Sequence, residues 1–212
     1  MKIHRLPNNP LEENTYVVSF ADKNAVIIDC GALYVEEKQR ISKYLSDNGL
    51  TPVAHLLTHG HFDHCFGARY IYETYGLKPV LPKADAFLYL GQAEQLRKLT
   101  GMSYPEPPLT EYIPLEEYDF HPLHCKYLST PGHTPGGVCY LFEDDGESAL
   151  FSGDTLFRGS IGRTDHDGGD MFQLLSSIRS QLLPLPDELT VFPGHGPRTT
   201  IANEKQYNTF LM

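Results

Sequence analysis

The sequence predicts an α/β (or α+β) protein with many strands, on three observations. Apolar runs of strand length alternate with amphipathic segments of helix length in both halves of the chain. Hydrophobic residues make up 41% and charged residues 21%, which excludes a disordered or low-complexity chain. The length of 212 residues lies between one and two typical domains, and because no linker interrupts the chain we expect a single domain over residues 1–212.

The first half is expected to alternate strands with helices. The first 20 residues contain the alternating run TYVVSF and an NNP turn, and they predict two short strands. Residues 35–49 carry apolar side chains at helical spacing and stop at Asn48-Gly49, which predicts an amphipathic helix. The other expected elements are strands over residues 23–31, 53–60 and 78–82, helices over 67–75 and 84–101, and an irregular segment over Pro105–Pro114.

The second half repeats this alternation. Strands are expected over residues 125–133, 137–145, 148–154 and 189–195, and one helix over 170–185. The two halves share a rhythm without a close sequence repeat, which favours two similar layers.

The charge balance excludes one class of partner. Lysine and arginine total 17 against 27 acidic residues, so the net charge is −10. A field of this sign repels polyanions, and no basic patch offsets it. Nucleic acid is therefore not an expected partner.

The amino-terminal sequence and the cysteines indicate the compartment. MKIHRLPNNPLEEN has no apolar core of signal-peptide length, and no run approaches the roughly 18 apolar residues of a membrane span. We therefore expect a soluble, cytoplasmic protein without a membrane partner. The four cysteines are widely spaced without a CxxC pair, which predicts reduced thiols. Nothing in the sequence indicates an oligomeric state.

Several predicted strands end in the same chemistry. Each places a side chain that can bind a metal beside a glycine, at a strand end, where ligand sites commonly form. These strand-end residues are Asp29, His59, His133, Asp154 and His195.

The densest of these signals is His59-Gly60-His61-Phe62-Asp63-His64, which follows an apolar strand. Three imidazoles and a carboxylate in six residues suit zinc, iron or manganese, and the lack of paired cysteines argues against a closed structural zinc site. A loop that reverses direction can direct His59 and His61 to one metal and Asp63 and His64 to another.

Structural roles compete with these assignments. A single histidine such as His133 or His195 can be an ordinary core or loop residue, and Asp154 can be a turn residue or a helix cap. Asp29 can simply terminate its strand. The histidine cluster gives the other strand-end residues a common purpose, because they can complete its coordination.

The HxHxDH motif, followed by a lone histidine, a lone aspartate and a final histidine, resembles the metallo-β-lactamase superfamily. FSGDTLFRGSIGRTD and FPGHGPRTTIANEKQYNTFL are similar to the short, single-domain branch of glyoxalase II-like hydrolases, also called hydroxyacylglutathione hydrolases. The resemblance covers nearly the whole chain. It implies a four-layer αβ/βα sandwich of two mixed sheets with helices outside, and no C-terminal helical glutathione-binding domain.

The resemblance also implies a ligand set. His59, His61 and His133 match the ligands of a first metal, and Asp63, His64 and His195 match those of a second. Asp154 matches the carboxylate that bridges two divalent ions, most often zinc, with iron or manganese as alternatives. Asp63 and Asp154 are the implied catalytic residues. Asp29 matches a residue that orients ligands without touching the metals.

Three further residues have open roles. Cys30 stands where the family often has proline, close enough in sequence to Asp29 to influence the metals. Cys65 is interpreted as a packing residue rather than a nucleophile. Arg163 matches a position where a basic residue can bind a substrate carboxylate, and its alternative is an ion pair with Asp165. The segment 81–114 can form a pocket wall or pack as a helix.

The activity that the resemblance implies is hydrolysis of a thioester of a small thiol, such as S-lactoylglutathione, by a hydroxide activated on the metals. One alternative is a persulfide dioxygenase with a single iron held by His59, His133 and Asp154. Others are a metallohydrolase of a different small ester and a metal-binding module without catalysis.

Overall fold

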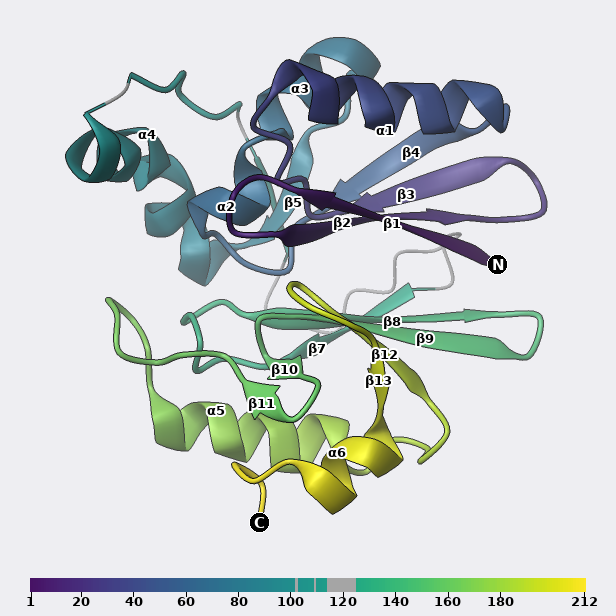
Figure 1. The fold of residues 1–212 in the computed structure, drawn as a ribbon, viewed down its shortest axis with the longest axis vertical. Coiled ribbons are helices and arrows are strands. Elements are labelled where there is room, and N and C mark those ends of the chain that lie inside the picture. Colours follow the sequence, from purple (N-terminus) through teal and green to yellow (C-terminus); the bar gives the residue numbers. More distant parts are fainter. Residues whose placement is uncertain (102, 109, 114–124) are drawn as a thin grey trace. The chain divides into compact units, whose positions relative to one another are not determined.

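The chain folds as two units, Met1–Ile113 and Pro114–Met212, each with its own mixed sheet and its own helices (Figure 1). The computed structural model describes all residues except 102, 109 and 114–124, and it gives only the backbone of residues 99, 100, 112 and 113. The expected class of mixed sheets with helices is confirmed. The expectation of a single domain over residues 1–212 stays a prediction.

The sheet of the first unit has six strands in sequence order. The first and second strands and the second and third strands pair antiparallel, and each later strand pairs in parallel with the one before it. The parallel part follows from helical crossovers between consecutive strands. The strands are β1 (Lys2–Asn8), β2 (Glu13–Ser19), β3 (Asn24–Ile28), β4 (Thr51–Leu56), β5 (Pro79–Pro82) and β6 (Glu111–Ile113).

Helices α1 (Val35–Asp47) and α3 (Ala68–Tyr75) cover one face of this sheet (Figure 1). Ile41 of α1 and Ile71 of α3 share one buried cluster with strand residues such as Val17 and Ile27. Burying these apolar faces is the main source of stability here. The unit also contains α2 (Phe62–Cys65), the 3₁₀ turn Lys83–Asp85, and α4 (Ala86–Thr100), which ends at Gly101 in the left-handed conformation.

This sheet contains a buried histidine in apolar surroundings. His55 of β4 is fully buried, and neither ring nitrogen has a hydrogen-bond partner among the described residues. It is flanked in the sheet by Ile27 and Pro79. Burial lowers the pKa of His55 to about 3, because the apolar surroundings disfavour the charged ring.

The sheet of the second unit has the order β13-β12-β9-β8-β7 and is also mixed. Its strands are β7 (Cys125–Ser129), β8 (Val138–Asp144), β9 (Glu147–Gly153), β12 (Thr190–Pro193) and β13 (Thr199–Thr200). Helix α5 (Met171–Ser177) continues into a π-helical turn, Ile178–Leu182, and shares a buried cluster with β8, β9, β12 and α6 (Ile201–Tyr207). A separate small hairpin pairs β10 (Leu156–Phe157) with β11 (Ser160–Ile161).

The buried carboxylate of Glu204 in α6 holds this hairpin. It accepts hydrogen bonds from Gly159 N (2.8 Å), Thr199 Oγ1 (2.5 Å) and the side-chain amide of Asn208 (2.8 Å). Asn208 also donates to the carbonyl of Ser160. The C-terminal helix therefore fixes the segment that directly follows Asp154.

We expect Glu204→Ala to lower the free energy of unfolding by about 3–5 kcal/mol, because several buried donors lose their acceptor at about 1–3 kcal/mol each. Urea unfolding measures this loss. The control is Lys205→Ala, which breaks only a surface pair with Asp187 and should cost less than about 1 kcal/mol. Equal losses in the two variants would contradict the role of Glu204.

Most expected elements are present, and the differences concern short segments. Residues 111–113 form β6, so the expectation of an irregular segment over Pro105–Pro114 is wrong in its last part. The hairpin β10–β11, β13 and α6 were not expected. These pieces are two to seven residues long, too short for a periodic pattern to show.

The thiols match their expected state. Cys30, Cys65, Cys125 and Cys139 are all buried and form no disulfide. Burial raises the pKa of Cys30 and of Cys65 far above the ordinary value and that of Cys139 to about 11, because a thiolate is poorly solvated there.

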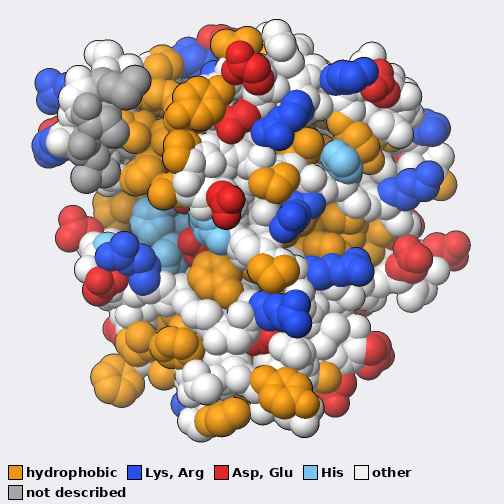
Figure 2. All heavy atoms as spheres, in the orientation of Figure 1, with side chains coloured by type: hydrophobic (Ala, Val, Ile, Leu, Met, Phe, Trp, Pro, Cys, Tyr) orange, Lys and Arg blue, Asp and Glu red, His pale blue; other side chains and the backbone are white. Residues whose placement is uncertain are grey.

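Two surface properties bear on partners. Among the described residues, no helix has both the length and the apolar composition needed to cross a bilayer. On the face drawn in Figure 2, lysine and arginine side chains are spread among acidic and uncharged ones.

Candidate functional site

The first unit brings the four residues of the HxHxDH motif together after β4. The chain leaves β4 at Leu56, and α2 begins at Phe62, directly after His61. The ring of His59 lies 4.8 Å from that of His61 and 4.1 Å from that of His64, measured between centroids. His64 Nε2 is 3.9 Å from Asp63 Oδ2. The segment between β4 and α2 and the start of α2 therefore gather three imidazoles and a carboxylate.

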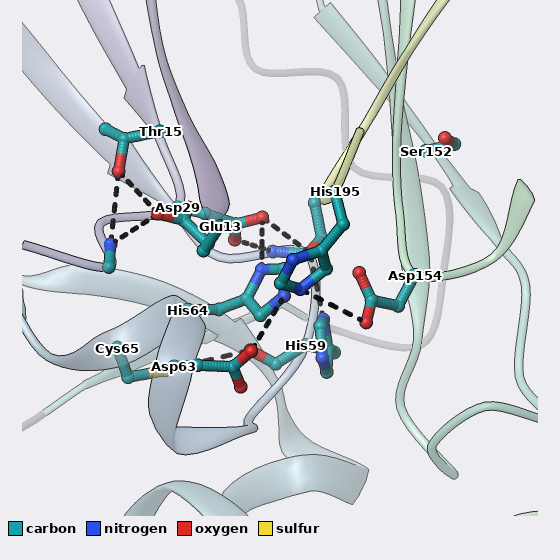
Figure 3. A network of polar contacts seen from close by, with 12 residues as sticks. Glu13, Thr15, Asp29, His59, Asp63, His64, Cys65, Ser152, Asp154 and His195 are labelled. Atoms are coloured by element: carbon teal, nitrogen blue, oxygen red, sulfur yellow. Dashed lines mark hydrogen bonds and ion pairs between the residues drawn. The ribbon is translucent and has the colours of Figure 1, made fainter. Parts of the chain in front are cut away.

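Asp29 anchors this cluster from the end of β3 (Figure 3). Its carboxylate accepts hydrogen bonds from Thr58 N (2.7 Å), Thr58 Oγ1 (2.8 Å) and His64 Nδ1 (2.9 Å). Asp29 itself has a φ of 52°, a conformation that is costly for a residue with a side chain. The bond to Asp29 places the proton of His64 on Nδ1, so Nε2 has its lone pair available for a metal.

The second unit brings together the other three predicted ligands. Asp154 follows β9, and His195 follows β12, which pairs with β9 in parallel. Asp154 Oδ2 is 3.5 Å from His133 Nε2 and 3.7 Å from His195 Nε2. His133 Nδ1 donates to the carbonyl of Arg163 (2.7 Å), which again leaves Nε2 toward the carboxylate.

Gly162 explains why this second cluster needs a glycine nearby. A Cβ at this position would lie 1.9 Å from the carbonyl oxygen of Asp154 and 3.0 Å from His133 Nδ1. The backbone therefore approaches both residues more closely than a side chain permits.

The donor set and spacing in each unit fit metal ions. The separations of 3.5, 3.7 and 3.9 Å between histidine nitrogens and carboxylate oxygens exceed a good hydrogen bond. Two ligands of one tetrahedral ion lie about 3.4 Å apart when each bond is about 2.1 Å long. Imidazole nitrogens with a second nitrogen anchored by a carboxylate or carbonyl are typical metal ligands. These residues can therefore hold zinc, iron or manganese.

Some of these side chains are accessible to a small molecule. His61 is partly exposed, and the side chain of His195 is 25% exposed. Figure 2 shows histidine side chains that reach the surface.

Arg163 forms the ion pair with Asp165 that the sequence offered as its alternative role. Its guanidinium is exposed and forms a bidentate pair with Asp165 (2.7 and 3.1 Å). Its carbonyl oxygen accepts a hydrogen bond from His133, a predicted ligand. His166, which sequence reasoning overlooked, places Nε2 3.4 Å from His133 Nδ1. The sequence GRTDH does not reveal this contact, because the contact depends on the loop folding back on His133.

The two cysteines near the first cluster differ in their surroundings. Cys65 packs with Leu57 and Ala68, and its raised pKa fits the expected packing role. Cys30 faces Gly67, where a Cβ would lie 2.2 Å from its sulfur. Its influence on metals stays a prediction.

Comparison with known proteins shows relatives of this chain over its whole length. The family model of the metallo-beta-lactamase superfamily matches residues 8–195, a range that contains all seven predicted ligands. The "Probable metallo-hydrolase YqgX" of Bacillus subtilis is 38% identical and covers 100% of this chain and 98% of its own. The "Hydroxyacylglutathione hydrolase GloC" of Haemophilus influenzae is 34% identical, with 100% and 98% covered.

Two solved structures share the fold. The crystal structure of the BLEG-1 B3 metallo-beta-lactamase has a TM-score of 0.89 and 36% identity, and both chains are covered fully. The crystal structure of TTHA1623 in a di-iron-bound form has a TM-score of 0.85 and 39% identity, with 98% of this chain and 100% of that chain covered.

Proposed function

Because this chain belongs to the metallo-β-lactamase superfamily, we propose that its hydrolytic chemistry is directed at a thioester, S-lactoylglutathione or a related S-acyl thiol. The chain is a metal-dependent hydrolase of this superfamily, with clusters of histidine and aspartate side chains that can hold metal ions. The choice of a thioester rests on the likeness to the hydroxyacylglutathione hydrolase of Haemophilus influenzae, which extends over the whole chain.

The observation that carries the proposal is that two histidines are held with Nε2 facing a carboxylate. In each unit a histidine has Nδ1 anchored, His64 on Asp29 and His133 on the Arg163 carbonyl, and presents Nε2 to a carboxylate. We assign His59, His61 and His133 to a first metal. Asp63, His64 and His195 are assigned to a second metal, and Asp154 is assigned to both. The di-iron form of TTHA1623 supports a pair of ions.

The chain's own residues account for the rest of the chemistry. Two divalent ions would supply a Lewis acid for the thioester carbonyl and a water of lowered pKa. Asp29 accepts from His64 Nδ1 and would keep this ring oriented with Nε2 toward a metal. Asp63 and Asp154 direct negative charge into their clusters, which offsets the charge of the ions.

A β-lactam is the second candidate substrate, because BLEG-1 is a metallo-beta-lactamase and matches this fold over its full length. Its amide carbonyl would use the same polarisation and attack. Assays of thioester and β-lactam hydrolysis distinguish the two candidate substrates.

The test combines metal content with turnover in one preparation. Elemental analysis of the freshly purified protein is paired with assays for S-lactoylglutathione hydrolysis, nitrocefin hydrolysis and oxygen uptake with glutathione persulfide. Two metals and thioester turnover, both lowered in His61→Ala, are the expected result. One iron with oxygen uptake would establish the dioxygenase instead, and nitrocefin turnover alone would establish the lactamase.

Arg163→Ala is expected to raise KM for S-lactoylglutathione about tenfold with little change in kcat, if its guanidinium binds the substrate carboxylate in the ground state. The matched variant is Asp165→Ala, which removes the competing anion and should lower KM. Steady-state kinetics at constant metal loading measure both. An unchanged KM in Arg163→Ala would leave the arginine only its ion pair with Asp165.

A further inference from the structure

Three segments of the first unit meet at Gly31: the region of the β1–β2 turn, the segment after Asp29 and the backbone of Asp63. We call the group formed by Asn9, Glu13, Gly31 and the Asp63 carbonyl the Gly31 junction. A Cβ on Gly31 would lie 2.2 Å from Glu13 Oε2, 2.4 Å from the Asp63 carbonyl oxygen and 2.5 Å from Asn9 Nδ2. No side chain fits there. Gly31 follows Asp29 by two residues, so the junction ties the turn of Asp29 to the backbone of Asp63.

Asn9 supplies one half of the connection. It lies in the turn between β1 and β2 with a φ of 50°, and only 8% of its surface is exposed. Its Nδ2 donates to the carbonyl oxygens of both Gly31 and Asp63, each at 3.0 Å. Its Oδ1 accepts from Leu11 N, so every side-chain polar atom is used. A single amide thus bridges two loops that lie 32 residues apart in sequence, from 31 to 63.

Glu13 supplies the other half. It begins β2 and is fully buried. Its Oε2 accepts from Gly31 N (2.9 Å). It also accepts from Thr15 Oγ1 (2.9 Å), which Figure 3 labels beside it. Its Oε1 has no hydrogen-bond partner among the described residues. One oxygen of Glu13 also lies within 4.8 Å of ligand atoms of Asp29 and His64.

We propose that Asn9 and Glu13 are positioning residues that fix the Asp29 turn and the Asp63 backbone in mutual register, so that Asp29 holds His64 and Asp63 is presented beside it. The proposal rests on the proposed function, in which His64 and Asp63 bind a metal. Asp29 is held in an unfavourable backbone conformation, so a partner must hold its turn in place. Gly31 N and Gly31 O are the backbone groups through which Glu13 and Asn9 do so.

The charge around Glu13 fits this assignment. Burial raises the pKa of Glu13 well above its ordinary range, with His64 acting against this shift and Asp29 and Asp63 acting in the same direction. The hydrogen bond from Gly31 N needs only an acceptor oxygen. Glutamine at this position retains that acceptor, whereas alanine removes it.

The test titrates the metal-free protein with Co²⁺ and follows the visible absorption bands and the two binding constants. Loss of an outer partner of a metal ligand typically weakens binding about 10–100-fold. We expect Glu13→Ala and Asn9→Ala each to weaken one of the two Co²⁺ sites by that factor, and Glu13→Gln to restore most of it. Ile71→Ala is the matched control. It removes a buried α3 side chain from the apolar cluster of the same unit and leaves the residues of the junction unchanged.

Urea unfolding of each variant checks that the comparison is fair, since all of them lose stability. If Ile71→Ala weakens Co²⁺ binding as much as Glu13→Ala at equal stability, the positioning role is overturned. It is also overturned if Glu13→Gln and Glu13→Ala behave alike. His64→Ala is the benchmark: a loss there without any loss in the junction variants overturns only the positioning role. No loss in His64→Ala overturns the ligand assignment and the proposal that rests on it.

Discussion

Asp154→Ala is expected to remove bound metal and to lower thioester turnover on the order of 1,000-fold or more. The carboxylate faces two imidazole nitrogens at 3.5 and 3.7 Å, so its loss leaves His133 and His195 without the anion that completes their cluster. Elemental analysis after gel filtration measures metal per chain, and steady-state assays at saturating metal measure kcat/KM.

Two further variants make the Asp154 result specific. Asp154→Asn keeps the shape but removes the charge, and it should retain part of the metal while losing most turnover. Asp187→Ala removes an exposed carboxylate of the same unit, which pairs with Lys205, and it should change neither quantity. Full metal content and turnover in Asp154→Ala would contradict its role as a ligand.

His55→Leu is expected to remove much of the acid sensitivity of the protein. The ring has a pKa of about 3 in the folded state and an ordinary pKa of about 6.5 in the unfolded chain. Below pH 6.5 the unfolded state therefore binds a proton that the folded state does not. Above pH 6.5 the ring is neutral in both states, so its titration leaves stability unchanged. Below pH 6.5 the free energy of unfolding falls by about 1.4 kcal/mol per pH unit as the pH drops toward 3.

The measurement is the free energy of urea unfolding of the metal-free protein at pH 7.5, 6.5, 5.5 and 5.0. Between pH 7.5 and 5.0 the wild type should lose about 2 kcal/mol more than His55→Leu. Leucine should also stabilise the protein at pH 7.5, because two buried nitrogens without partners are replaced by an apolar side chain. Parallel pH profiles for the two proteins would show that His55 is already protonated or solvated in the fold.

The candidate site could be predicted from the sequence because its residues lie at strand ends. Runs such as VIIDCG and ALFSGD predict a buried strand followed by a polar residue. In the structure, Asp29 and Asp154 directly follow β3 and β9. The dense HxHxDH motif likewise forms its cluster from neighbours in sequence. Local pattern and local geometry coincide at these positions.

What the sequence could not reveal depends on distant partners. Asn9 and Glu13 look like ordinary turn and edge residues, and only the fold brings them to Gly31 and Asp63. Glu204 sits in a polar C-terminal segment, yet it is buried because it binds the backbone of a hairpin 45 residues earlier. His55 in an apolar strand gave no sign of its missing partners. Hydrogen bonds between distant segments leave no periodic signal in a single sequence.

The burial of the thiols has a consequence for an enzyme that would release a free thiol at each turnover. Disulfide exchange requires an accessible thiolate as attacking or attacked group. The four cysteines are buried, and the raised pKa of Cys30, Cys65 and Cys139 keeps them protonated at neutral pH. The folded protein should therefore accumulate no mixed disulfide with glutathione, even in an oxidised pool, and mass spectrometry should find its intact mass unchanged. Its activity would follow the supply of thioester rather than the redox state of the thiol that it releases.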